Sequence, residues 1–224
     1  MPPTTITRMS EESSVVTSKH FEYVAERTRG DDEFLLALKD AAAAAGIPKI
    51  WVSPEQASFM RIVLKLAGAR RVLEVGTLAG YSAITMARAL PDDGEVVSLE
   101  LEPEYARFAM DQVEQSDVRG RVRVVVGDAR ATIAELDGDP FDAAFLDADK
   151  SGYPIYLEHA HRLLRPGALL MVDNAFAFGE LLADQPQDPE VGAVRKFNDL
   201  LASDERFESV IVPVGDGLWV GRKR

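Results

Sequence analysis

The feature that most constrains the fold of this 224-residue chain is an alternation of short apolar runs with amphipathic stretches, which begins at Arg71. Nearly continuous apolar runs of this length are typical of strands buried on both faces, and the stretches between them have helical spacing. Alternation of strands and helices predicts an α/β fold, a mostly parallel sheet with helices on both faces. The predicted strands are residues 72–75, 96–101, 122–126, 141–146 and 168–172, and the predicted helices between them are residues 80–90, 103–116, 128–136 and 152–164.

The end of the chain breaks this alternation. Residues 206–213 and 218–221 read as two strands separated by Gly215-Asp216-Gly217. Asp-Gly between apolar runs is a strong hairpin signal, so we expect an antiparallel pair at the edge of the parallel sheet. Residues 176–190, after the fifth predicted strand, contain turn-forming Gly and Pro, and we expect a loop there in the position of a lid.

The chain ahead of the first strand has a polar start and two helical segments. Residues 1–14 are polar, and we expect them to be flexible. The first helical segment ends at Gly46, and the second begins at Ser53-Pro54, a pair that suits a helix cap and the first helical position. We therefore expect a single domain over residues 15–224, in which about residues 15–68 form a helical cap.

Composition excludes several classes of protein. The chain has no cysteine, which excludes disulfides, thiolate metal sites and a cysteine nucleophile. Its 25 Lys and Arg against 37 Asp and Glu give a net charge of −12, which disfavours a nucleic acid partner because such binding needs a basic footprint. No apolar run approaches the length of a membrane span, and no secretory signal pattern is visible at the start. We expect a cytoplasmic protein that contacts no membrane.

Three predicted strands end in residues suited to a nucleoside. The first runs through Glu74 into Gly76, which permits a tight turn, and Gly80 permits close approach at the next helix start. The middle glycine of the fingerprint G-x-G-x-x-G is missing, and Glu74 repels phosphates and favours a cationic ligand. Glu100 ends the second strand, where it can accept hydrogen bonds from ribose hydroxyls, and Gly127-Asp128-Ala129 follows the third. The set favours an adenosine that carries a sulfonium; the alternative is that the glycines only turn the chain and Glu100 is solvated.

Carboxylates follow the fourth and fifth predicted strands. Asp147 ends the fourth strand, and Asp173-Asn174 ends the fifth. If these strands are neighbours, their oxygen ligands meet at one point and suit Mg²⁺, Ca²⁺ or Mn²⁺. Lys150 lies three residues after Asp147, and a nearby cation disfavours a protonated lysine, which prepares it as a general base. The alternative is a plain ion pair between Asp147 and Lys150, with Asp173 capping a loop.

Five short motifs, spread over roughly residues 50–222, carry a resemblance. They are LEVGTLAGYSA, GDA, FLDADKSGY, VDN and PVGDGL. Together they resemble the cation-dependent O-methyltransferases of the caffeoyl-coenzyme A and catechol type. The resemblance implies a Rossmann-like methyltransferase fold with N-terminal helices, a mostly parallel seven-stranded sheet and an antiparallel C-terminal hairpin. It also implies S-adenosyl-L-methionine as the cofactor and a homodimer.

The resemblance assigns a role to individual residues. Lys150 matches the general base. Asp147, Asp173 and Asn174 match the ligands of a divalent cation, Mg²⁺ in first place with Ca²⁺ or Mn²⁺ as alternatives. The positions that match cofactor contacts are Val52, Glu74, Gly76, Thr77, Ser82, Glu100, Ala129, Asp147 and Asp149.

The chain departs from the plant members of that family at two positions. Val52 stands where they usually have Thr, and Phe178 stands where they have an Asn that touches substrate. The plant substrate therefore does not carry over, and we expect a small aromatic substrate with vicinal hydroxyls, catechol-like or caffeoyl-type. Phe176, Phe178 and Trp51 either stack on it or pack inside the protein. Two alternatives stay open. One is a methyltransferase of a hydroxylated tRNA base, because Arg119, Arg121 and Arg123 form a basic cluster. The other is a scaffold that binds the cofactor without catalysis.

Overall fold

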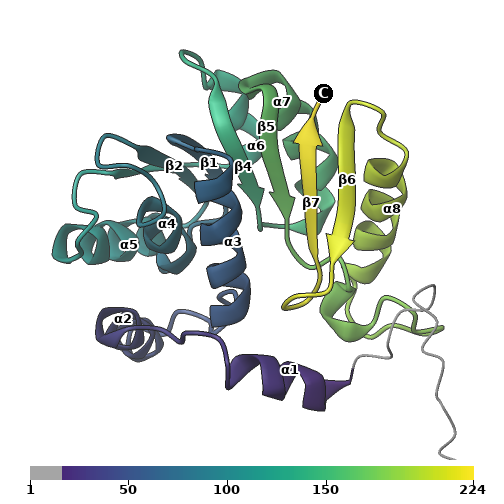
Figure 1. Cartoon of the computed structure of the whole chain (residues 1–224), viewed down its shortest axis with the longest axis horizontal. Helices are drawn as coiled ribbons and strands as arrows, with labels where there is room; N and C mark the ends of the chain where they lie inside the picture. The colour runs from purple at the N-terminus through teal and green to yellow at the C-terminus, as the bar shows by residue number, and fades with distance from the viewer. Residues whose placement is uncertain (1–16) are drawn as a thin grey trace, which may run out of the picture.

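The computed structural model describes residues 17–224, so the predicted flexible segment 1–14 lies outside the described residues. The described chain contains a seven-stranded sheet in the order β3-β2-β1-β4-β5-β7-β6 (Figure 1). The first five strands pair in parallel, and β7 pairs antiparallel with both β5 and β6, which confirms the predicted fold class. The strands are β1 (Arg71–Val75), β2 (Glu95–Glu100), β3 (Val122–Val126), β4 (Phe141–Leu146), β5 (Leu164–Val172), β6 (Phe207–Val212) and β7 (Leu218–Lys223).

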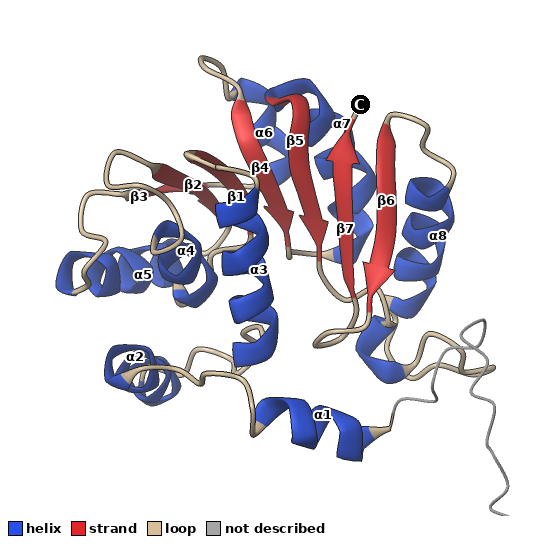
Figure 2. Cartoon of the chain, viewed as in Figure 1, coloured by secondary structure: helices blue, strands red, loops and turns tan. Residues whose placement is uncertain are grey.

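Helices cover both faces of the sheet (Figure 2). Alternate strand residues point to opposite faces, so Val72 packs into one hydrophobic core with α2, α3, α4 and α5, and Leu73 packs into the other with α6, α7 and α8. Within residues 17–224, no helix is both long and apolar enough to cross a membrane. The helices are α1 (Ser18–Ala25), α2 (Glu33–Ala44), α3 (Pro54–Leu66), α4 (Tyr81–Ala87), α5 (Pro103–Gln115), α6 (Ala129–Glu135), α7 (Tyr153–Leu163) and α8 (Val191–Ala202), with two 3₁₀ turns, η1 (Lys150–Gly152) and η2 (Ala177–Gly179).

Side-chain caps begin α2 and α3, and the cap of α3 is the one that the sequence predicted. The Asp32 side chain accepts a hydrogen bond from Leu35 N at 3.0 Å, and Ser53 Oγ accepts one from Gln56 N at 3.2 Å. Such caps satisfy donors that a helix start leaves free. Figure 1 shows α1 beyond the carboxyl ends of β4 and β5, and α2 at the lower left, beneath α4 and α5. The helical cap therefore lies at the end of the sheet where ligands bind in open α/β folds.

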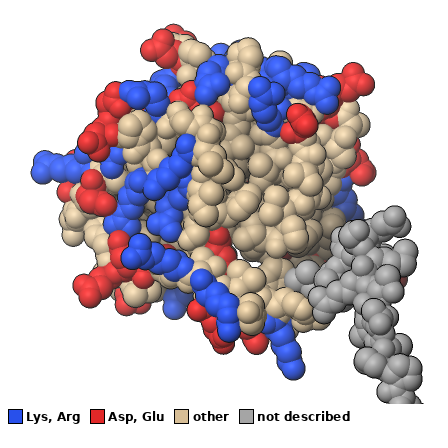
Figure 3. All heavy atoms as spheres, viewed as in Figure 1, with Lys and Arg blue, Asp and Glu red and all other residues tan. Residues whose placement is uncertain are grey.

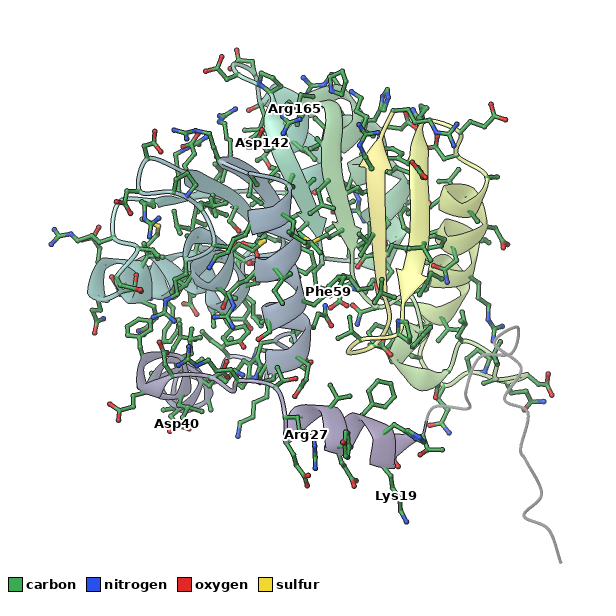
Figure 4. All side chains as sticks on the ribbon, viewed as in Figure 1. Lys19, Arg27, Asp40, Phe59, Asp142 and Arg165 are labelled. Atoms are coloured by element: carbon green, nitrogen blue, oxygen red, sulfur yellow. The ribbon has the colours of Figure 1, made fainter. Side chains whose placement is uncertain are left out.

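The opposite end of the sheet is fixed by a single carboxylate, that of Asp142 on β4. Its Oδ1 accepts a hydrogen bond from Arg165 Nε on β5 at 2.7 Å. Its Oδ2 accepts bonds from the backbone N–H groups of Arg70 and Arg71, at 2.8 and 2.9 Å, where β1 begins. Figure 4 shows Asp142 and Arg165 together at the end of the sheet remote from α1. This arrangement ties the starts of β1, β4 and β5 to one another.

Some element boundaries differ from those predicted. Strand β5 begins at Leu164 rather than at 168, although it contains Pro166 and Gly167, because a register shift in its pairing with β4 accommodates them. The helices α1 and α8 were not predicted. Helix α8 buries a stripe of apolar side chains, whereas α1 buries none.

Candidate active site

A cavity of about 900 Å³ opens at the carboxyl ends of the parallel strands. Its volume is within the range of small-molecule sites, and its place is the one expected for a ligand in an open α/β sheet. Glu74 and Asp173 do not line it. The other predicted site residues do: Val52, Gly76, Thr77, Ser82, Glu100, Ala129, Asp147, Asp149, Lys150 and Asn174.

The turn after β1 requires glycine at position 76. Gly76 has φ +102°, and a Cβ placed there would lie 2.0 Å from the carbonyl oxygen of Asp147. A side chain at this position would therefore separate the end of β1 from the end of β4. The glycine lets the two strand ends meet at one wall of the cavity, as the sequence predicted for a tight turn.

Glu100 organises the same turn. Its Oε2 accepts hydrogen bonds from the N–H groups of Thr77 and Leu78, at 3.1 and 2.7 Å, and its Oε1 accepts one from Glu102 N at 2.9 Å. Leu78 has φ +49°, a left-handed conformation that L-residues rarely adopt. The carboxylate predicted to bind ribose thus also holds a strained turn. A carboxylate has about four acceptor sites, so Glu100 keeps room for a further donor.

Glu74 is fully buried beside the cavity. Its Oε2 accepts a hydrogen bond from Ser98 Oγ, and its Oε1 has no partner among the described residues. Burial raises the pKa of Glu74 to about 8, although the hydroxyls of Ser82 and Ser98 act to lower it. The side chain is therefore mostly protonated at pH 7 unless a cationic ligand stabilises its ionised form.

The ends of β4 and β5 bring Asp147 and Asp173 to adjacent positions. Leu146 pairs with Val172 in parallel register, and Asp173 N donates to Leu146 O at 3.0 Å. Burial, and after it the negative charge of Asp147, raises the pKa of Asp173 to about 7. The Oδ1 atom of Asp173 is buried without a hydrogen-bond partner in the described structure.

These features fit a divalent cation. Buried carboxylates that lack partners are stabilised by a nearby positive charge, and oxygen donors suit Mg²⁺, Ca²⁺ and Mn²⁺. Within residues 17–224, no group of three or more His, Cys, Asp and Glu side chains is placed to hold a metal ion. The set at this point therefore depends on an amide as its third member, Asn174, which has φ +61° and lines the cavity.

Lys150 lies at the same point and is 5% exposed. Its Nζ donates hydrogen bonds to Asp147 Oδ1 at 3.2 Å and to Tyr153 Oη at 2.8 Å. Its backbone N–H donates to Glu190 Oε1 at 3.0 Å. The ion pair that the sequence offered as an alternative is thus present. It also places the amine against the candidate cation site, as the general-base interpretation requires.

Asp149 is held by three side chains. Its carboxylate accepts hydrogen bonds from Tyr156 Oη at 2.5 Å and Ser151 Oγ at 2.8 Å, and it pairs with Arg130. Partial burial alone would raise the pKa of Asp149, but the hydrogen bonds from Tyr156 and Ser151 and the charge of Arg130 outweigh it and lower the pKa. The residue stays ionised at the mouth of the cavity.

Sequence reasoning missed several lining residues. Arg130 directly follows the GDA step, and Tyr156 lies one helical turn after Tyr153, so both stood beside recognised motifs. Trp51 and Phe178, left open as stacking or packing residues, line the cavity. The lining residues that no pattern singled out include Ile50, Leu101, Tyr105, Arg130, Tyr156 and Glu190.

The chain is similar in sequence and in structure to known O-methyltransferases. The profile of a family described as O-methyltransferase matches residues 25–224. The catechol O-methyltransferase of Niastella koreensis is 37% identical over 85% of this chain and 87% of its own length. The catechol O-methyltransferase of Mycobacterium tuberculosis is 39% identical over 86% of this chain and 87% of its own length. The structure of an O-methyltransferase from Bacillus cereus, in complex with SAH, superposes with a TM-score of 0.82 at 34% identity, covering 91% of this chain and 96% of that one.

Proposed function

This chain belongs to the O-methyltransferase family and is an enzyme that uses S-adenosyl-L-methionine. From that premise we propose that it methylates one of two vicinal hydroxyls on a small aromatic substrate and that this reaction requires a divalent cation. One observation carries the proposal. Asp147 and Asp173 lie at adjacent strand ends, with Lys150 Nζ buried 3.2 Å from Asp147 Oδ1. This arrangement joins a cation site to a proton acceptor.

The residues assigned to the cofactor surround the β1 and β2 ends of the cavity. Glu100 keeps an acceptor site for ribose hydroxyls, and the unpartnered oxygen of Glu74 suits a cationic group. The hydroxyl of Ser82 would be a further polar contact, whereas the Thr77 hydroxyl is engaged by Ser98 Oγ. The full set that would hold S-adenosyl-L-methionine is Val52, Glu74, Gly76, Thr77, Ser82, Glu100, Ala129, Asp147 and Asp149.

Asp147, Asp173 and Asn174 would hold the cation, for which Mg²⁺ is the first candidate and Ca²⁺ and Mn²⁺ share the preference for oxygen. When bound, the cofactor supplies a methyl group on a sulfonium, and the cation supplies Lewis acidity that favours an ionised hydroxyl. The buried, unpartnered Oδ1 of Asp173 supports this assignment.

The protein's own contribution is proton removal and alignment. Lys150, in its neutral form, accepts the proton of the substrate hydroxyl that is to be methylated. Asp147 and Tyr153 hold its Nζ at that point. Trp51 and Phe178 provide aromatic walls for a planar ring. Fixing two reactants in register can supply roughly 7–11 kcal/mol of the barrier reduction, so we assign most of the rate to this positioning.

The small aromatic substrate is favoured over a tRNA base. Two of the arginines that suggested RNA are engaged within the protein. Arg119 pairs with Glu114 at 2.8 Å, and Arg121 Nη1 donates to the carbonyl of Pro91 at 3.2 Å. The relatives named catechol O-methyltransferases support a catechol-like ligand. A non-catalytic scaffold would not need the buried Lys150 and the buried Asp173 at the ends of adjacent strands.

We further propose a homodimer. Figures 1 and 3 show a broad surface without charged side chains over the lower front of β6 and β7, beside α3, whereas Glu208 and Arg222 are exposed toward the other end of these strands. On this side Phe59 lies between α3 and the sheet (Figure 4), and Leu66 and Val210 are 82% and 60% exposed. Exposed apolar surfaces of this kind mark interfaces. Analytical ultracentrifugation should give a mass twice that of the 24.5 kDa chain. The variant Leu66→Glu should reduce this mass. The control variant Leu182→Glu, at a loop residue that is 92% exposed, should leave it unchanged.

The first test of the activity is S-adenosylhomocysteine production with a panel of catechols, in Mg²⁺ and then in excess EDTA. We expect turnover that EDTA removes. Asp173→Ala should abolish turnover and leave S-adenosylhomocysteine affinity nearly unchanged, while Asp184→Ala, in the exposed loop, should change neither. Turnover that resists EDTA would contradict the cation, and folded protein that binds the cofactor but leaves every catechol unchanged would contradict the substrate class.

A further inference from the structure

The turn between β6 and β7 packs on the segment that follows β5. Ala175 N donates to Gly217 O at 2.8 Å, and Phe176 N donates to Asp216 O at 2.9 Å. The sequence identified Gly215-Asp216-Gly217 as a hairpin turn and as part of the motif PVGDGL, without a role for Asp216. These backbone bonds join it instead to the residues that close the cavity, about forty positions earlier in the chain.

The two glycines explain how the turn approaches so closely. Gly215 has φ +57°, and a Cβ there would lie 1.9 Å from Oε1 of the buried Gln56. Gly217 has φ +79°, and a Cβ there would lie 2.8 Å from the ring of Phe176. Side chains at either position would push the turn outward. The glycines therefore fix where the Asp216 side chain stands.

One oxygen of Asp216 holds two groups of the active site. Asp216 Oδ2 accepts a hydrogen bond from Asn174 Nδ2 at 3.1 Å and another from Phe178 N at 2.7 Å. An amide side chain has one donor end and one acceptor end. Because the donor end of Asn174 is directed to Asp216, its oxygen is the group left for the candidate cation.

The same carboxylate sets the aromatic wall. Asn174, Ala177 and Phe178 all have positive φ, at 61°, 52° and 58°, which non-glycine residues rarely adopt without support. The bond from Phe178 N to Asp216 provides that support. The Phe178 ring lies with its centroid 5.8 Å from Lys150 Nζ. A shift of this loop would move the ring away from the proton acceptor.

We propose that Asp216 is a positioning residue, which orients the amide of Asn174 toward the cation and fixes Phe178 as the substrate wall. The proposal rests on the cation site of the proposed function. The last hairpin of the chain thereby sets both metal affinity and substrate fit. Outer-shell groups of this kind change metal affinity by about 10–100-fold when they are removed.

The test compares three variants of the full chain with the wild type. Asp216→Ala removes both hydrogen bonds. Asp216→Asn keeps a neutral oxygen that can accept them, more weakly than a carboxylate does. Asp184→Ala removes the same charge from the exposed loop and serves as the matched control. The readouts are Mn²⁺ affinity from the electron paramagnetic resonance signal of free Mn²⁺, S-adenosylhomocysteine affinity by calorimetry, and kcat and KM with a catechol.

We expect Asp216→Ala to weaken Mn²⁺ binding about tenfold or more, to raise KM for the catechol, and to leave S-adenosylhomocysteine affinity within about twofold of wild type, since no cofactor contact is removed. Asp216→Asn should recover most of the Mn²⁺ affinity, and Asp184→Ala should match the wild type. If Asp216→Ala does not fold, Asp216→Glu, which displaces the carboxylate by one methylene, should weaken Mn²⁺ binding in its place.

Two results would overturn the proposal. The first leaves the proposed cation site intact, and the second overturns the cation site as well. Wild-type Mn²⁺ affinity in a folded Asp216→Ala or Asp216→Glu variant refutes the role of Asp216 and leaves the cation site standing. A wild-type protein that binds no Mn²⁺, while Asp173→Ala behaves identically, removes the cation site and Asp216's role together.

Discussion

The burial of Glu74 leads to a prediction about stability and pH. Glu74→Gln replaces a buried carboxyl with a neutral side chain of the same shape, which can still accept the hydrogen bond from Ser98 Oγ. The wild-type carboxyl has one unpartnered oxygen and is fully buried. Ionisation is therefore costly in the folded protein without ligand, and it carries no such cost in the unfolded chain.

The direction and size follow from the pKa. The folded-state pKa of Glu74 is about 8, against 4.5 for an ordinary Glu. Below pH 4.5 both states hold the proton and the full stability is present. Above it the unfolded chain loses the proton first, so the free energy of unfolding falls by about 1.4 kcal/mol per pH unit until the pH passes the folded pKa. Between pH 5 and 7.5 the wild type should lose about 3 kcal/mol relative to Glu74→Gln.

The assay is urea unfolding of both proteins without ligand at half-unit pH intervals from 5 to 8.5. Taking the difference between the two proteins cancels the other groups that titrate in this range, including Asp173, so only Glu74 contributes. We expect the smallest difference near pH 5 and a widening advantage for the variant above it. A difference that is constant across the range would mean that Glu74 is ionised in the folded protein and would refute the reasoning.

Three further predictions concern neighbouring residues. Tyr153→Phe removes one of the two hydrogen bonds of the buried Lys150 Nζ and should cost about 1.5–3 kcal/mol of unfolding free energy. It should also lower kcat more than it changes KM. An unchanged kcat would show that Tyr153 does not position Lys150. Gly76→Ala should destabilise by about 3 kcal/mol or more and abolish S-adenosylhomocysteine binding, because its Cβ meets the Asp147 carbonyl. Gly46→Ala, with a similar positive φ and no atom within 4 Å, measures the backbone contribution alone, and equal losses in the two variants would rule out the clash. Excess EDTA should lower the thermal midpoint of the metal-loaded wild type and leave that of Asp173→Ala unchanged in urea-free buffer, as differential scanning fluorimetry can check.

The sheet was predictable because its strands are short and apolar, and its central strands are buried on both faces. Such runs differ sharply from the amphipathic helices between them, and Asp-Gly at 216–217 marked the hairpin. Boundaries failed where local signals conflicted with packing. Pro166 and Gly167 argued against a strand, yet pairing with β4 extends β5 back to Leu164. Helix α8 was missed although it buries Phe197 and Leu201, because the polar, turn-rich stretch before it masked the change of pattern.

Much of the candidate site was predictable for a topological reason. Parallel strands end at the same edge of a sheet, so residues after separate strands, such as Gly76, Glu100 and Asp147, had to converge. Arg130 and Glu190 were not predictable in this way. Each acts through a long-range hydrogen bond, to Ser151 and to the N–H of Lys150, and no local pattern encodes such a partner.

The sequence by itself determined the fold class, the order of the strands in the chain and the identity of most side chains that gather at the cavity, since periodicity and strand-end position are local properties. Only the tertiary structure decided the chemical state and orientation of those groups. The pKa of Glu74 and of Asp173 depends on burial and on neighbouring charges, and Asn174 is oriented by Asp216, which lies 42 residues away. Electrostatics and hydrogen bonding act through space, so these properties exist only once the chain has folded.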